Sequence, residues 1–187
     1  MNTSLEKEVI QELSALADPT YQSFQAKLVP QIDPNLILGV RTPALRAYAK
    51  AFAKNQPDKA HAFIKQLPHT YYEENNVHGE LIGYLARTPQ EAFELLDTFL
   101  PYVDNWATCD LMRIPALKKD LDATLAKIKE WIHAEPEYMV RFGVVELMTL
   151  FLDDAFDPQH LFLIADIKRD EYYINMARAW YYSFALI

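Results

Sequence analysis

The chain has 187 residues, of which 51% are hydrophobic and 24% are charged, the composition of a soluble globular protein with one substantial core. We therefore expect a single domain over residues 1–187. The formal charge of -8 argues against indiscriminate binding of phosphate backbones, because that affinity comes from basic residues that release counterions.

Other features narrow the class of protein. No apolar run approaches the roughly 20 residues of a membrane helix, and the N-terminus lacks the apolar region of a signal peptide, so a cytoplasmic protein is predicted. The single cysteine, Cys109, permits no intramolecular disulfide, and without a histidine near it in sequence it is interpreted as a structural thiol. The histidines lack the paired spacing of a zinc site. We predict neither a metal nor a cofactor.

Helix starts are marked along the chain by a capping residue followed by proline. This pattern predicts helices beginning at Asp18-Pro19, Asp33-Pro34, Thr42-Pro43, Thr88-Pro89 and Asp157-Pro158. Two segments, Thr3 to Glu6 and Thr88 to Glu91, also fit a capping box, in which a threonine and a glutamate three residues later satisfy the first turn.

Between these starts the apolar residues recur every three or four positions, as in Leu45, Ala49 and Phe52, and no segment alternates as a strand does. The pattern predicts an all-α fold of about ten or eleven short helices, paired antiparallel and stacked into a curved solenoid. The helix over residues 137–151 is apolar nearly all round and should be central. Pro115 should end or bend a helix that begins near Asp104.

Basic residues are concentrated in the N-terminal third, between Arg41 and Lys65. Arg46, Lys50 and Lys54 follow one another at four-residue spacing, which places them on one face of a helix. This face is a candidate for contact with DNA phosphates, and a solvated helix surface explains it equally well.

The most informative stretch for function is Asp104-Asn-Trp-Ala-Thr-Cys-Asp110. On a helix it places Trp106 and Asp110 on one face, one turn apart. This pair suits a cationic substrate, because an indole face attracts positive charge and a carboxylate does so by direct Coulomb attraction. Two other runs could complete a site: Val140 to Met148, which contains Arg141, and Tyr172 to Trp180.

These three segments, together with Tyr21 to Pro30 and Leu38 to Arg46, resemble the DNA alkylation repair glycosylases built from HEAT-like helical repeats, the AlkD-like proteins. The resemblance extends over nearly the whole chain. It implies a HEAT-like or ARM-like solenoid with a concave groove, and a glycosylase of base excision repair that removes cationic N3- or N7-alkylated purines from duplex DNA. It assigns Trp106, Asp110, Arg141 and Trp180 to the site.

The roles follow from the chemistry of the reaction. Asp110 would stabilise the developing sugar cation and position a water, while Trp106 and Trp180 would exclude bulk water and offer their ring faces. Arg141 would hold a phosphate, with Arg178 as a further basic residue before Trp180. A structural alternative is that Asp110 neutralises Arg141, because a buried charge needs a partner.

Two functions therefore remain open. One is an active glycosylase with weak affinity for DNA that carries alkylated bases. The other is a catalytically weak or inactive helical-repeat binding protein, which the acidic composition and the acidic pair Asp170 and Glu171 favour. The chain also ends on an apolar segment at Ile187, where the family generally continues with further helices. That ending suggests a truncated product, a protein partner or oligomer contact, or local disorder.

Overall fold

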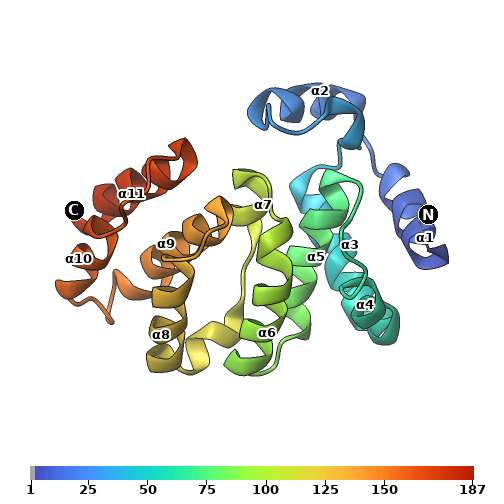
Figure 1. Cartoon of the computed structure of the whole chain (residues 1–187). Helices are drawn as coiled ribbons and strands as arrows, with labels where there is room; N and C mark the ends of the chain where they lie inside the picture. Colours follow the sequence, from blue (N-terminus) through green and yellow to red (C-terminus); the bar gives the residue numbers. More distant parts are fainter. Residues whose placement is uncertain (1–2) are drawn as a thin grey trace. The chain divides into compact units, whose positions relative to one another are not determined.

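The computed structural model describes residues 3–187, and within them it contains eleven α-helices and three short 3₁₀ helices (Figure 1). The all-α prediction is confirmed. The α-helices are α1 Ser4–Ser14, α2 Pro19–Leu28, α3 Thr42–Asn55, α4 Pro57–Phe63, α5 Tyr72–Leu85, α6 Pro89–Phe99, α7 Trp106–Leu111, α8 Leu121–Trp131, α9 Glu137–Phe151, α10 Gln159–Ala165 and α11 Tyr172–Ala185. The 3₁₀ helices are η1 Pro34–Leu36, η2 Leu100–Tyr102 and η3 Pro115–Lys119.

Most helix starts follow the capping residues read from the sequence. Thr3 and Thr88 form complete capping boxes with the glutamates three residues later, and the Asp18 carboxylate accepts hydrogen bonds from the amides of Thr20 and Tyr21. These side chains satisfy amides that have no partner inside the first turn.

Three predicted starts need correction. Arg41, rather than Thr42, occupies the N-cap of α3, and Pro43 still fits because the second helical residue also needs no amide partner. After Asp33 the chain makes only the 3₁₀ helix η1. Helix α10 begins at Gln159, although the Asp157 carboxylate still accepts a hydrogen bond from the Gln159 amide at 2.8 Å.

The predicted effect of Pro115 is confirmed in part, since the helix ends earlier than expected. Helix α7 stops at Leu111, and Pro115 opens η3 instead of bending a longer helix. The proline ring would clash with the carbonyl of the residue four positions earlier, which is Leu111, so a continuous helix is excluded from that point.

The chain forms two compact units. The first comprises the chain up to Arg87 together with Leu111–Ile114, and the second comprises Thr88–Asp110 and Pro115–Ile187. Because the predicted solenoid and its concave groove depend on how these units are arranged, both remain predictions, as does the single domain.

In the first unit, α3 and α5 pack side by side and run in the same direction (Figure 1). Glu73, at the start of α5, accepts hydrogen bonds from the amides of Leu38, Gly39 and Val40, at 2.8, 2.7 and 3.2 Å. These three residues precede α3. The turn requires glycine at position 39, where φ is +91°.

In the second unit, α9 lies between α8 and α11. Its residues are buried on nearly every face, including Arg141 and Glu146, so the predicted central position of residues 137–151 is confirmed. Gly143 lets α8 approach closely, because a Cβ at this position would lie 2.8 Å from the Ile132 side chain. Trp131, the last residue of α8, is 1% exposed and donates its indole N–H to Asp97.

Candidate active site

Helix α7 carries the two residues that first indicated a site. Trp106 and Asp110 are its first and fifth residues, so they lie on one face one turn apart, and both are half-buried. The helix start is fixed by Asn105, whose buried side chain accepts the Thr108 amide at 2.8 Å and donates to the Thr108 hydroxyl at 2.9 Å. This arrangement satisfies an amide of the first turn.

Asp110 forms a two-point ion pair with Arg141 of α9. The guanidinium Nε donates to Oδ1 at 2.9 Å and Nη2 donates to Oδ2 at 2.5 Å, while Nη1 donates to the Tyr173 carbonyl at 2.8 Å. The side chain of Arg141 is 5% exposed and that of Asp110 is 15% exposed. Burial alone lowers the pKa of Arg141, and the hydrogen bonds and charge of Asp110 outweigh it, so the pKa lies above its ordinary value.

This geometry gives Arg141 a positioning role. Its planar fork sets the orientation of the Asp110 carboxylate, and the contact with Tyr173 ties the pair to α11. The pairing that the sequence left open therefore exists. The phosphate-binding role of Arg141 stays a prediction.

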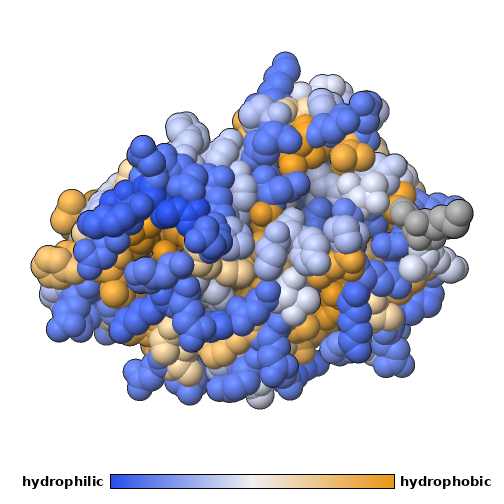
Figure 2. Space-filling view, viewed as in Figure 1, coloured by the Kyte–Doolittle hydropathy of each residue, from blue (hydrophilic) through white to orange (hydrophobic). Residues whose placement is uncertain are grey.

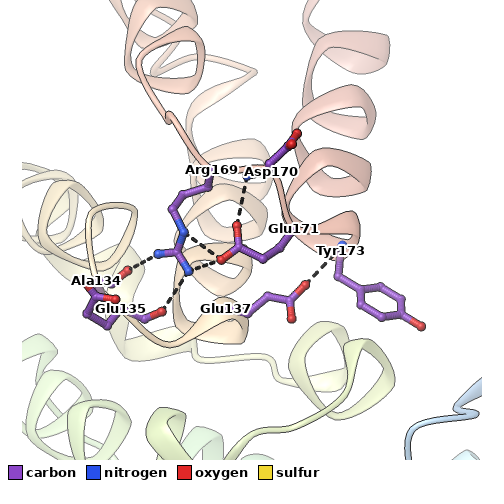
Figure 3. Close-up of polar contacts among 7 residues, drawn as sticks. All are labelled: Ala134, Glu135, Glu137, Arg169, Asp170, Glu171 and Tyr173. Carbon is purple, nitrogen blue, oxygen red and sulfur yellow. Dashed lines mark hydrogen bonds and ion pairs between the residues drawn. The ribbon is translucent and has the colours of Figure 1, made fainter.

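A second arginine holds the start of α11 against the start of α9 (Figure 3). Arg169, in the connection before α11, donates to the carbonyls of Ala134 and Glu135 at 2.9 and 3.0 Å and is paired with Glu171. Glu137, the first residue of α9, accepts the Tyr173 amide at 3.3 Å. These contacts fix the Tyr173 carbonyl where Arg141 reaches it.

Trp180 lies farther along α11 than Tyr173, by seven residues or roughly 10 Å of helix. It is 39% exposed and lines a pocket of about 300 Å³ with side chains from the C-terminal part of α9 and the residues after it. Because Arg141 reaches Tyr173 while Met148 and Trp180 share this pocket, α9 and α11 run in the same direction. A common site for Trp180 and Asp110 remains a prediction.

The other predicted DNA contacts lie in different surroundings. Arg178 donates to Asn175 at 2.9 Å and to the Ile164 carbonyl at 3.3 Å, which directs it toward α10. Arg46 pairs with the nearly buried Glu80 at 2.9 Å and donates to the Leu111 carbonyl. Lys50 and Lys54 are exposed on α3, so they are the members of this set most accessible to a phosphate.

Acidic residues from earlier in the chain neutralise part of the basic N-terminal segment. Arg41 pairs with Asp18 at 2.7 Å, and Lys59 pairs with Glu8 of α1 at 2.6 Å. Both carboxylates come from before residue 41, so the local charge pattern between Arg41 and Lys65 gives no sign of them.

The surroundings of Cys109 agree with its interpretation as a structural thiol. It is 1% exposed, its thiol lies 3.5 Å from the Tyr138 carbonyl, and burial raises its pKa well above the usual value. A thiol in this state is a poor nucleophile.

Two kinds of feature are absent from residues 3–187. No cluster of three or more histidine, cysteine or acidic side chains there could hold a metal ion. No helix in that range is long and apolar enough to cross a membrane.

Sequence reasoning missed the residues that position the site. Arg169 and Glu137 act through backbone groups of distant segments, and these partners carry no side-chain signature in the sequence. The only local signal of these contacts is the Arg169-x-Glu171 spacing, which allows the two side chains to form an ion pair across a turn. Asn105 was identifiable, since asparagine before a helical stretch is a common cap.

Comparison with known proteins places the chain in a family. A search of curated proteins found no match, and neither did a search of solved structures. A family model described as DNA alkylation repair enzyme matches residues 9–181, which include every residue of the candidate site. The chain therefore belongs to the family of DNA alkylation repair enzymes, which gives it a role in DNA repair.

Proposed function

We propose that the protein is a DNA glycosylase that excises cationic N3- or N7-alkylated purines from duplex DNA. The observation that carries the proposal is the Trp106 and Asp110 face of α7, with its carboxylate held in one orientation by Arg141. Membership of a DNA alkylation repair family supports the same class of substrate.

The chemistry suits a carboxylate rather than a strong acid. An alkylated purine already carries positive charge, so it leaves with little or no protonation, and the sugar becomes an oxocarbenium ion. Asp110 stabilises this cation and positions the attacking water, and the oriented carboxylate needs little rearrangement during the reaction. Trp106, one turn away, excludes bulk water and offers its ring face to the cation. Trp180 completes the proposed site from α11.

A second function has its own support. The protein carries a net charge of -8, and Arg41, Arg46 and Lys59 are paired with carboxylates. Half of the basic residues between Arg41 and Lys65 are thus already paired, which reduces the charge left for DNA phosphates and favours a helical-repeat binding protein with a weak or inactive site. The exposed apolar side chains of Phe184, Leu186 and Ile187 support a partner or oligomer contact at the C-terminal end.

One experiment separates the two functions. Release of methylated purine is measured from alkylated duplex DNA at low and moderate salt, with the parent and with Asp110→Asn. The glycosylase proposal expects release by the parent and a loss on the order of 100-fold in the variant, as for removal of one strong electrostatic stabiliser. A parent without activity at low salt supports the binding protein instead.

A further inference from the structure

A pocket beside Trp180 contains two residues, Asp153 and Phe184, that the proposed glycosylase reaction does not use. It lies between α9 and α11 near their C-terminal ends and encloses about 300 Å³, at the small end of the range for ligand sites. Its lining comprises Met148, Thr149, Leu152, Asp153, Trp180 and Phe184. Hydrophobic side chains also reach the surface in this part of the molecule, at the left-hand edge of Figure 2 over α10 and α11.

Two aromatic rings form one side of the pocket. The centroids of Trp180 and Phe184 lie 6.3 Å apart, and the ring planes meet at 59°. The rings therefore form a corner instead of a closed stack, and a small group placed there contacts both. Both side chains are well exposed, at 39% and 56%. Each ring face has negative electrostatic potential and attracts a cation within about 6 Å.

Asp153 gives the pocket its charge, because it is the one ionisable residue in the lining. It is exposed and forms no salt bridge with any residue between 3 and 187. Within that range no lysine or arginine lies over the ring of Trp180 or Phe184 either. The pocket thus has two features that attract a cation and no internal cation that satisfies them.

We propose that this pocket binds a small organic cation whose charge is spread over methyl groups or an aromatic ring. The lining has too few polar groups to replace the hydration shell of a metal ion or a primary ammonium group. A methylated or heteroaromatic cation loses less hydration, and it gains contact with the rings and Coulomb attraction from Asp153. An anion is excluded by the same carboxylate.

Two sources supply this chemistry, a methylated ammonium group and an N-alkylated purine. The binding test needs neither DNA nor catalysis, so its outcome does not depend on the proposed glycosylase activity.

The test measures binding of three probes to the full chain by NMR titration at low salt. The probes are tetramethylammonium, 7-methylguanosine at mildly acidic pH, where its ring is cationic, and guanosine as the neutral counterpart of similar shape. We expect at least one of the two cations to bind. If 7-methylguanosine is the one that binds, guanosine should bind at least about tenfold more weakly. Binding of tetramethylammonium alone assigns the pocket to methylated ammonium groups.

Variants locate the bound cation. Asp153→Asn should weaken its binding about fivefold, as for loss of one exposed ion pair, and Phe184→Leu should also weaken it. Asp154→Asn is the matched control, because it removes the adjacent exposed carboxylate, which does not line the pocket, and should change nothing. No binding of either cation would overturn the proposal. Equal affinity for guanosine and 7-methylguanosine without binding of tetramethylammonium would also overturn it, as would unchanged affinity of the bound cation in Asp153→Asn. Because these side chains are exposed, the variants should fold.

Discussion

At the scale of single residues, the second unit is organised around a buried charge pair. Arg141 lies inside an otherwise apolar helix, where an unpaired guanidinium would be very unfavourable, and Asp110 supplies its counter-charge. The same contact serves the proposed chemistry, because a carboxylate held by two hydrogen bonds keeps its orientation while a cation forms nearby. Stability and activity are therefore expected to depend on the same two side chains.

Replacing Arg141 tests this dependence. Arg141→Ala breaks the ion pair with Asp110 and should lower the free energy of unfolding by about 3–5 kcal/mol, the usual result of breaking a buried pair. Arg141→Lys keeps the charge but not the two-point geometry, so it should restore part of the stability and less of the base release. Urea unfolding and purine release are the measurements. A stable Arg141→Ala protein with full activity would contradict the positioning role.

A half-buried histidine, His69, and a buried one, His78, predict a pH dependence of stability. His69 Nε2 lies 2.8 Å from His78 Nδ1. Burial lowers the pKa of His69 to about 4. Burial, together with the charge of His69, lowers the pKa of His78 well below its usual value. The unfolded chain, whose histidines have a pKa near 6.5, takes up protons first as pH falls. Stability should therefore decrease between about pH 6.5 and 4, by up to about 1.4 kcal/mol per pH unit for each histidine.

The control for this effect is His69→Gln, which should reduce the slope of unfolding free energy against pH. Burial raises the pKa of Glu73 and Glu74, and backbone hydrogen bonds only partly oppose it. Raised carboxyl pKa values act in the opposite direction, increasing stability as pH falls toward 4.5. That contribution is common to the parent and the variant, so the difference in slope reports the histidines, and an identical slope in both proteins would refute the assignment.

At the scale of elements, the sequence was sufficient where local chemistry decides the structure. Capping residues located α1, α2 and α6, and the continuous apolar run located α9. It was insufficient for α5, the central helix of the first unit. That helix buries five polar side chains, and Glu73 is satisfied by amides from residues 38–40. Polar side chains in a sequence do not indicate burial when their hydrogen-bond partners are backbone groups of distant segments.

The packing of α8 on α9 can be tested at Gly143. Gly143→Ala adds a methyl group that meets the Ile132 side chain at 2.8 Å, and overpacking of this kind typically costs about 1–3 kcal/mol. We expect a lower urea midpoint with an unchanged slope. The helix propensity of alanine favours the variant by up to about 1 kcal/mol. A more stable variant would therefore mean that propensity outweighs the close contact between the two helices.

At the scale of the whole molecule, the family and the proposed site residues followed from motifs, while their surroundings did not. Trp106 and Asp110 share a face because their spacing requires it on a helix. The pairing of Asp110 with Arg141, the neutralisation of Arg46 by Glu80 and the pocket beside Trp180 depend on contacts between distant segments. Charge counted along the sequence therefore overstated the basic surface that DNA could contact.

This surface gives a prediction for DNA affinity. The double variant Lys50→Ala and Lys54→Ala should weaken binding to duplex DNA and reduce the slope of log affinity against log salt, by roughly one unit for each phosphate that the variant no longer binds. Fluorescence anisotropy on undamaged and alkylated duplexes at several salt concentrations measures both quantities. Lys118→Ala, a surface lysine outside the basic face, is the control. Unchanged affinity and slope would show that α3 presents only a solvated surface.

Release of methylated purine from alkylated duplex DNA decides whether the protein is a glycosylase. We expect release by the parent at low salt, less release as salt rises, and a loss on the order of 100-fold in Asp110→Asn with DNA binding nearly unchanged. Equal release by the parent and Asp110→Asn would contradict the role of Asp110, and a parent that binds alkylated DNA without releasing any base would contradict the glycosylase itself.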